Sequence, residues 1–258
     1  MPRRRRNIMK RWIAGILVLL CLVPMAAAEQ PDDEFLLSFY NDSVFFGDSI
    51  TKALRRYRSA VRQTDPDFMP STDIICTDNI SLFAGSRNRL TGDYHFQYRG
   101  RESTMYDITA QINPKKVFIL LGLNDPAGSK IEKAIGWVED IIRIMAERFP
   151  ETEVYFFSNT PVALYYCREK NRPDYPEQVT AYNARLKETC EARGAHYVEI
   201  AEPMKDENGY LNLNYSSDDR CHLSDEGVKV WIECLKDYAR EQYDLGLWIP
   251  EESVKEGA

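Results

Sequence analysis

A serine, an asparagine and a histidine lie where they could together carry out nucleophilic chemistry. Ser49 ends the stretch Phe45-Phe46-Gly47-Asp48-Ser49, in which an apolar strand runs through a glycine turn into the start of a helix. A hydroxyl in that position lies beside the unpaired N–H groups and the positive end of the helix. This environment suits a nucleophile whose reaction develops negative charge nearby. Taken alone, the stretch has a simpler interpretation, with Ser49 as a helix N-cap.

The chain offers partners for such a serine. His222 precedes the last predicted helix and could take the serine proton, and Asp219 could hold the other ring nitrogen. Asp218 competes with Asp219 for that role. An oxyanion could accept hydrogen bonds from the Asn124 amide and from the backbone N–H of Ser49. The simpler alternatives are a turn at Asn124 and a surface histidine at His222.

Strand and helix patterns alternate along the chain and predict where these residues lie. The expected strands cover 42–46, 73–76, 117–121, 154–157 and 196–200, and the main expected helices cover 51–63, 103–112, 130–149, 176–193 and 224–243. This alternation predicts an α/β fold, a doubly wound, mostly parallel five-stranded sheet with helices on both faces. Residues 85–101 and 158–175 are expected to be irregular. Since sites in such sheets form beyond the carboxyl ends of the strands, the candidate residues should meet at one edge.

Residues 1–28 have the pattern of a secretory signal peptide. A basic head precedes an apolar run over 12–25, and three alanines end at Ala28. The run is shorter than the roughly 20 residues of a membrane-spanning helix, which favours cleavage near Ala28 over an uncleaved anchor. We therefore expect a secreted or cell-surface protein that has no stable membrane partner after cleavage.

The net charge argues against one class of partner, and the cysteine content leaves one disulfide pairing open. The formal net charge of −7 argues against nucleic acid as a partner. Five cysteines follow the leader, and at least one of an odd number is unpaired. No two of them form a CxxC pair, so we expect no zinc site. A bridge between Cys167 and Cys221, which would hold the His222 loop, and an unpaired Cys221 remain alternatives.

Three blocks in the expected order resemble the SGNH, or GDSL-type, esterase and lipase family. Phe46-Gly47-Asp48-Ser49 is similar to its nucleophile block, Leu121-Gly122-Leu123-Asn124-Asp125 to its G-x-N-D block, and Asp219-Arg220-Cys221-His222 to its D-x-x-H block. The resemblance extends over residues 44–238. It implies Ser49 as nucleophile, His222 as base and Asp219 as orienting acid. It also implies Asn124 as an oxyanion donor, and it implies neither a metal nor an organic cofactor.

One block departs from the family's pattern. The family places a glycine after the second strand, and the N–H of that glycine joins the oxyanion hole. Ser81 lies near this position, and Gly85 comes a few residues late. Because a backbone donor does not require glycine, the N–H of Ser81 could serve, and Ser81 and Gly85 remain alternatives.

The resemblance implies an exported carboxylester hydrolase that works through an acyl-enzyme. Its expected substrate is a small acyl ester or an acylated glycan, with a short acyl group such as acetyl. The alternatives are an O-acyltransferase with the same triad and a glycan-binding module with a decayed site. The expected parts are a polar lead-in over 29–42, the hydrolase domain over 43–248 and a polar tail over 249–258. The particular ester and the oligomeric state are left open.

Overall fold

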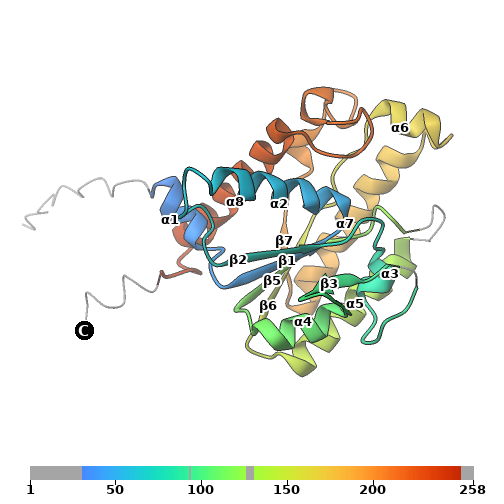
Figure 1. The fold of residues 1–258 in the computed structure, drawn as a ribbon. Helices are drawn as coiled ribbons and strands as arrows, with labels where there is room; N and C mark the ends of the chain where they lie inside the picture. The colour runs from blue at the N-terminus through green and yellow to red at the C-terminus, as the bar shows by residue number, and fades with distance from the viewer. Residues whose placement is uncertain (1–30, 93, 126–130, 251–258) are drawn as a thin grey trace, which may run out of the picture. The chain divides into compact units, whose positions relative to one another are not determined.

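Five parallel strands form the central sheet of the computed structural model, which describes residues 31–92, 94–125 and 131–250 (Figure 1). In chain order they are β1 (Ser43–Gly47), β2 (Thr72–Cys76), β5 (Lys116–Leu120), β6 (Glu153–Phe157) and β7 (His196–Val198). Their order in the sheet is β2-β1-β5-β6-β7, and every neighbouring pair is parallel. The predicted α/β fold is confirmed. The predicted signal peptide over 1–28 and most of the predicted tail lie outside the described residues.

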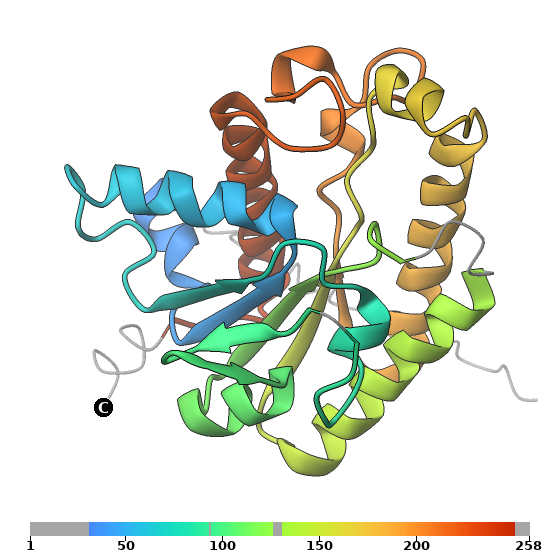
Figure 2. The same ribbon diagram turned by 45° about the vertical axis from the view of Figure 1, so that its right-hand side comes forward.

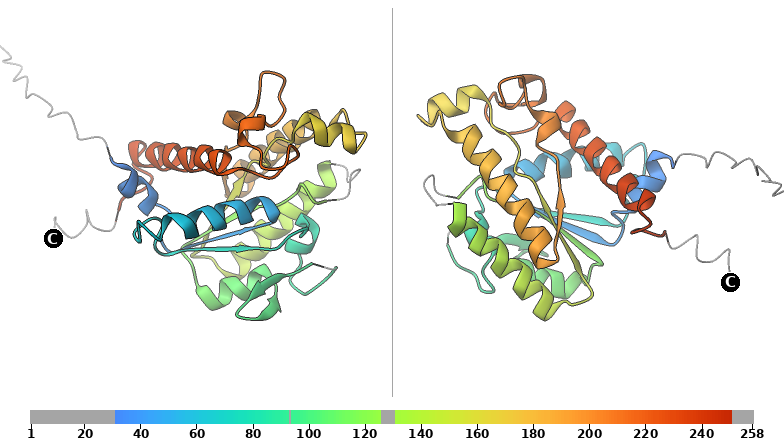
Figure 3. Two further views of the ribbon diagram at one scale, coloured as in Figure 1. Left: turned by 45° about the horizontal axis from the view of Figure 1, so that its top comes forward. Right: turned by 180° about the vertical axis from the view of Figure 1, so that it is seen from behind.

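Helices cover both faces of the sheet, so the strands are buried on both sides. One face carries α1 (Asp33–Ser38), α2 (Ser49–Val61) and α8 (Asp225–Asp244), and the other carries α3 (Leu82–Gly85), α4 (Met105–Ile112), α5 (Ile131–Arg148) and α7 (Tyr175–Arg193). Figure 3 shows α5 and α7 side by side when the molecule is viewed from behind. Phe45 of β1 packs toward the first face, and its neighbours Val44 and Phe46 pack toward the second. This alternation explains the unbroken apolar strand sequences.

Local signals set the ends of the helices. The Asp48 side chain caps α2 by accepting from the N–H of Ile50 at 2.9 Å. Ser224 caps α8 as its sequence suggests, and α7 ends at Gly194, whose φ of +75° is one that glycine adopts without strain. The N-cap of α4 is Thr104 rather than Ser103, the expected cap. The expected helices are otherwise displaced by only a few residues at either end.

Three segments are more ordered than their sequence indicates. In the predicted polar lead-in, α1 buries Leu36 and Leu37 in the core that α8 shares. In the predicted excursion, β3 (Phe96–Tyr98) pairs with β4 (Arg101–Ser103), and in the predicted 158–175 loop α6 (Leu164–Glu169) forms a short helix. Each element has too few residues to show a period in sequence, and its stability comes from tertiary packing.

The strand order places a topological switch point between β1 and β5. After β1 the chain moves outward to β2, and it later returns to add β5 on the other side of β1. Loops that leave these two adjacent strands separate at this point, which is where open α/β sheets form their sites. Ser49 follows β1 and Asn124 follows β5.

The segment from β7 to α8 must reach back from the edge of the sheet. Short 3-10 turns at Glu202–Met204 and Leu213–Tyr215 interrupt it. It is anchored to the segment after β6, because Leu211 N–H donates to the Val162 carbonyl at 3.0 Å and Ala163 N–H donates to the Arg220 carbonyl at 2.6 Å. Figure 2 shows this segment in orange beside the start of α2.

We expect Gly47→Ala to destabilise the protein by about 1–3 kcal/mol, as for other overpacked positions. A Cβ on Gly47 would lie 1.9 Å from Thr51 Oγ1 and 2.5 Å from Thr51 Cβ, because the strand turns directly into α2. Urea unfolding measures the loss. Thr51→Gly supplies the matched test, since the double variant should be more stable than the sum of the two single changes predicts. Simple additivity would contradict the proposed collision.

Candidate active site

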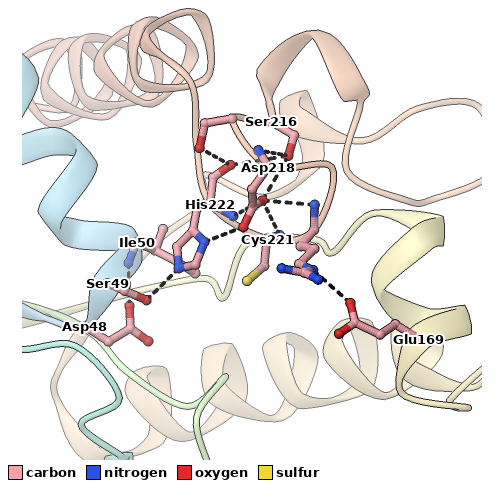
Figure 4. A network of polar contacts seen from close by, with 10 residues as sticks. Asp48, Ser49, Ile50, Glu169, Ser216, Asp218, Cys221 and His222 are labelled. Carbon is pink, nitrogen blue, oxygen red and sulfur yellow. Dashed lines mark hydrogen bonds and ion pairs between the residues drawn. The ribbon is translucent and has the colours of Figure 1, made fainter.

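Ser49, His222 and Asp218 form a continuous chain of hydrogen bonds. His222 Nε2 lies 3.0 Å from Ser49 Oγ, and His222 Nδ1 lies 2.6 Å from Asp218 Oδ2 (Figure 4). The serine and the histidine are 173 positions apart in the sequence and come from opposite ends of the domain. The arrangement lets one ring nitrogen accept the serine proton while the other is held by a carboxylate.

The prediction that Asp219 contacts His222 is wrong. Asp219 is exposed and has a φ of +56°, a left-handed conformation that turns the loop. The turn folds Asp218 under the loop, where its Oδ1 accepts from the backbone N–H groups of Arg220, Cys221 and His222 at 2.9–3.2 Å. Asp218 Oδ2 is thereby directed at the His222 ring.

The surroundings of Asp218 favour its charged form. Burial by itself would raise the pKa of Asp218, but the hydrogen bonds from the His222 ring and from the loop's N–H groups outweigh it and hold the pKa below its ordinary value. A carboxylate that stays ionised can stabilise an imidazolium on His222.

Asp48, directly before the nucleophile, links the loops after β1 and β5. Its carboxyl is buried, and Oδ2 accepts from Asn124 Nδ2 at 2.8 Å while Oδ1 caps α2. The same Asn124 amide also lies 3.3 Å from the Ile80 carbonyl. Asn124 is thus brought beside the nucleophile turn. An oxyanion would compete most readily with the longer of these two bonds.

Burial makes Asp48 an unusual carboxyl. It raises the pKa of Asp48 to about 7, although the N–H of Ile50 and the nearby His222 act in the opposite direction. Sequence reasoning missed this residue as part of the site. The N-cap rule could have identified its contact with Ile50, but its contact with Asn124 depends on the pairing of β1 with β5.

Ser81 has a capping role. Its hydroxyl accepts from the N–H of Ala84 at 3.1 Å at the start of α3. The carbonyl of Ile80 is directed at Asn124, and the carbonyl and N–H of one trans peptide point in opposite directions. The N–H of Ser81 therefore points away from Asn124, and the structure does not direct these two expected oxyanion donors at one point.

Asp125 fixes the loop after β5 against the same short helix. Its two carboxylate oxygens accept from the N–H groups of Leu82 and Phe83 at 2.8 and 3.1 Å. The sequence places Asp125 in the family's G-x-N-D block, but only the fold shows that it caps α3. Asn124 and Asp125 together join three loops at the carboxyl edge of the sheet.

Ser49 and His222 open into a cleft of about 660 Å³. Most of the residues that line it are polar, among them Lys52, Asp78 and Asn79, and Ala53 and Leu223 are its apolar members. A second cavity, of about 480 Å³, is lined by α1, α8 and residues near 65–69 and contains none of the triad side chains.

Three other features of the described residues concern disulfides, metal sites and membrane-spanning helices. Cys167 and Cys221 are both free thiols, so the structure contains no bridge between them. Among residues 31–92, 94–125 and 131–250, no cluster of His, Cys, Asp or Glu side chains is arranged to hold a metal ion. No helix within the part of the chain that the structure describes is long and apolar enough to cross a membrane.

Comparison with known proteins identifies the family of this chain. Residues 45–230 match the model of the GDSL-like lipase/acylhydrolase family. No curated protein matches the sequence. A GDSL-like lipase from Bacteroides thetaiotaomicron has a TM-score of 0.59 and 18% identity, over 84% of this chain and 93% of that chain.

Two further solved structures are similar in fold. A Bacteroides fragilis protein, provisionally described as an acylhydrolase, has a TM-score of 0.59 and 16% identity, over 84% of this chain and 92% of its own. A psychrotrophic esterase of Pseudoalteromonas sp., in a structure inhibited by monoethylphosphonate, has a TM-score of 0.54 and 13% identity, over 79% of this chain and 100% of its own.

The two neighbouring aspartates provide a matched test of the site. Asp218→Asn should lower kcat/KM on a short ester by on the order of 10²-fold or more, because the amide cannot stabilise an imidazolium. Asp219→Asn should retain at least a third of the activity, since its side chain is exposed. Steady-state kinetics of the two variants decide between them, and a larger loss at Asp219 would overturn the assignment.

Asp48→Asn should change how stability depends on pH. The native Asp48 pKa of about 7 lies above its ordinary value of 3.8, so the native protein retains a proton that the unfolded chain releases. The free energy of unfolding of the wild type should therefore fall between about pH 4 and pH 7, by up to about 1.4 kcal/mol per pH unit, and then level off. Urea unfolding across this range should give a flatter curve for the variant.

Asp218→Asn is the control of opposite sign for this experiment. Because the native pKa of Asp218 is lowered, its carboxylate contributes stability above its ordinary pKa and loses that contribution as the pH falls further. The difference between wild type and Asp218→Asn should thus change only at the acid end. Parallel curves for wild type and Asp48→Asn would contradict a raised pKa at Asp48.

Proposed function

Because this chain belongs to the GDSL-like lipase/acylhydrolase family and is a carboxylester hydrolase, we propose that it acts through a triad of Ser49, His222 and Asp218. The observation that carries this proposal is the hydrogen-bonded chain Ser49 Oγ–His222 Nε2 and His222 Nδ1–Asp218 Oδ2, at 3.0 and 2.6 Å. Nucleophile, base and orienting acid are each within direct reach of the next.

In the first half of the reaction, Ser49 Oγ attacks the acyl carbonyl of the ester. His222 Nε2 takes the hydroxyl proton, and the Asp218 carboxylate stabilises the imidazolium that forms. The carbonyl oxygen becomes negative at the start of α2, where the backbone N–H of Ser49 and the Asn124 amide can donate to it. The tetrahedral intermediate then collapses, and the alcohol leaves with the proton from Nε2.

In the second half, water removes the acyl group from Ser49. His222 Nε2 accepts a proton from the water as it attacks the acyl-enzyme, and it returns that proton to Ser49 Oγ as the acid departs. The reaction uses the same donors for the second oxyanion. The role of Asp48 is to position groups, since its carboxylate holds both the helix start and Asn124.

The residues that line the cleft favour a substrate whose alcohol part is polar. Lys52, Asp78 and Asn79 line it, and its apolar members, Ala53 and Leu223, are too few for a long acyl chain. We infer a short acyl group, such as acetyl, on a polar and glycan-like alcohol. Export of the protein rests on the sequence pattern over 1–28 and is tested by sequencing the amino terminus of the mature protein from the medium.

Ser49→Ala should abolish turnover of p-nitrophenyl acetate while preserving the fold. The expected loss of kcat is on the order of 10³-fold or more, as for other triad nucleophiles. Ser59→Ala is the matched control, because Ser59 lies in the same cleft but its hydroxyl bonds to the Arg55 carbonyl within α2. Comparable activity in Ser49→Ala and wild type would reject the proposal.

The same assay extends to acyl length and to the acceptor. Activity should fall as the acyl chain of the p-nitrophenyl ester lengthens from acetate to octanoate. Released acetate is compared with acetyl groups transferred to an added glycan, and predominant transfer would make the protein an acyltransferase instead. Glycan binding without any Ser49-dependent reaction would favour a binding module.

A further inference from the structure

The cleft beside Ser49 extends along one face of α2. Ser49, Lys52, Arg56 and Ser59 all line it, at the three- and four-residue spacing that places side chains on one side of a helix. Ten residues of helix rise about 15 Å, so the cleft continues well beyond the acyl group of a short ester. This wall is therefore available to the alcohol part of the substrate.

The charge of this wall is positive. The α2 sequence SITKALRRYRSAV contains four basic residues and no acidic one, and a fifth basic residue, Arg62, follows it as the C-cap, although the whole chain has a net charge of −7. Two of these five have a structural role at the far end of the helix. Arg58 and Arg62 donate to the carbonyls of Met69 and Pro70 at 2.6–3.2 Å.

The three basic residues that line the cleft differ in how they are paired. Lys52 Nζ lies 2.7 Å from Asp78, and Arg56 lies 3.1 Å from Asp225. Arg55 forms neither an ion pair nor a hydrogen bond through its side chain with any residue that the structure describes. Its guanidinium has five N–H donors, so it is the cation in the cleft with capacity for a ligand.

Arg55 also lies near the reacting edge of the sheet. It follows Ser49 by six residues, a rise of about 9 Å along the helix. Its charge reaches Cys76 at the carboxyl end of β2: burial raises the pKa of Cys76 to about 11, and Arg55 acts in the opposite direction. An anion bound to Arg55 would therefore lie close to the alcohol side of an ester held at Ser49.

We propose that Arg55 binds an anionic group, a carboxylate or a phosphate, on the alcohol part of the ester. The inference rests on the proposed function, because it assumes that Ser49 attacks an ester in this cleft. This proposal narrows the expected substrate class to acylated acidic sugars, which are acylated uronates or acylated sugar phosphates. A guanidinium suits both groups, since its planar pair of N–H donors matches two oxygens of either one. Because Asp78 is paired with Lys52, its carboxylate repels a bound anion less than an unpaired carboxylate would.

Three acetate esters of similar shape provide the test: neutral 4-acetoxybenzamide, 4-acetoxybenzoate and 4-acetoxyphenyl phosphate. The measured quantity is the ratio of kcat/KM for each anionic ester to kcat/KM for the neutral one, which cancels effects on the catalytic step. Arg55→Gln should lower this ratio by about tenfold, as for the loss of a charge-assisted hydrogen bond. The anion with the larger loss identifies the group that Arg55 prefers.

Two other variants act as controls. Arg143→Gln, in an exposed arginine of α5 that pairs with Asp140 and Glu147, should leave the ratio unchanged. Asp78→Asn removes a negative charge from the cleft and should raise the ratio. Added NaCl should raise KM for the anionic esters more than for the neutral ester, because salt screens exposed charges.

The outcomes separate this inference from the proposed function. If Ser49-dependent hydrolysis of the neutral ester is observed but the ratio is the same in wild type and Arg55→Gln, the anion site is rejected and the esterase proposal stands. If none of the three esters is hydrolysed, the same two anions are tested as ligands of Ser49→Ala by thermal unfolding. A stabilising shift that disappears in the Ser49→Ala, Arg55→Gln double variant supports the anion site, and absence of a shift rejects it.

Discussion

The buried carboxyl group of Asp48 is the interaction on which the site depends. One of its oxygens begins α2 and the other holds Asn124, so a single side chain positions the nucleophile and an amide from an adjacent strand. Its cost is desolvation, which raises the pKa of Asp48 to about 7. Two hydrogen bonds offset part of that cost. The short connection between β1 and α2 leaves no room for adjustment, because Gly47 already lies against Thr51.

The catalytic loop illustrates a different constraint. His222 lies on a segment that leaves the edge strand β7, whereas Ser49 follows β1, and two strands lie between β1 and β7 in the sheet. Hydrogen bonds from the segment after β6 hold this loop in place. Within the loop, the Asp218 carboxylate accepts three backbone N–H groups as well as the His222 ring. The acid therefore builds the loop that carries the base, and no disulfide takes part in it.

Helix α2 joins the chemistry of the site to its specificity. Its first residue is the nucleophile, and its following turns supply the basic wall of the cleft. Two arginines at its end donate hydrogen bonds to backbone carbonyls, and Lys52 and Arg56 form ion pairs with carboxylates. Arg55 differs from them in having its donors unoccupied by described residues. One element thus positions both the group that attacks and a group that can select the ester.

The sequence by itself determined the fold class, the order of the sheet's strands along the chain, and the pairing of Ser49 with His222 as candidates. These features rest on the local periodicity of apolar residues, on apolar runs and on motifs of a few adjacent residues. The choice between Asp218 and Asp219 could not be made in this way, because it depends on the left-handed turn at Asp219. The link from Asp48 to Asn124, the cap that Asp125 provides and the free donors of Arg55 were decided only by the tertiary structure. Each of them depends on which strands and loops are neighbours, and that neighbourhood arises from burial of both faces of the sheet rather than from any local pattern.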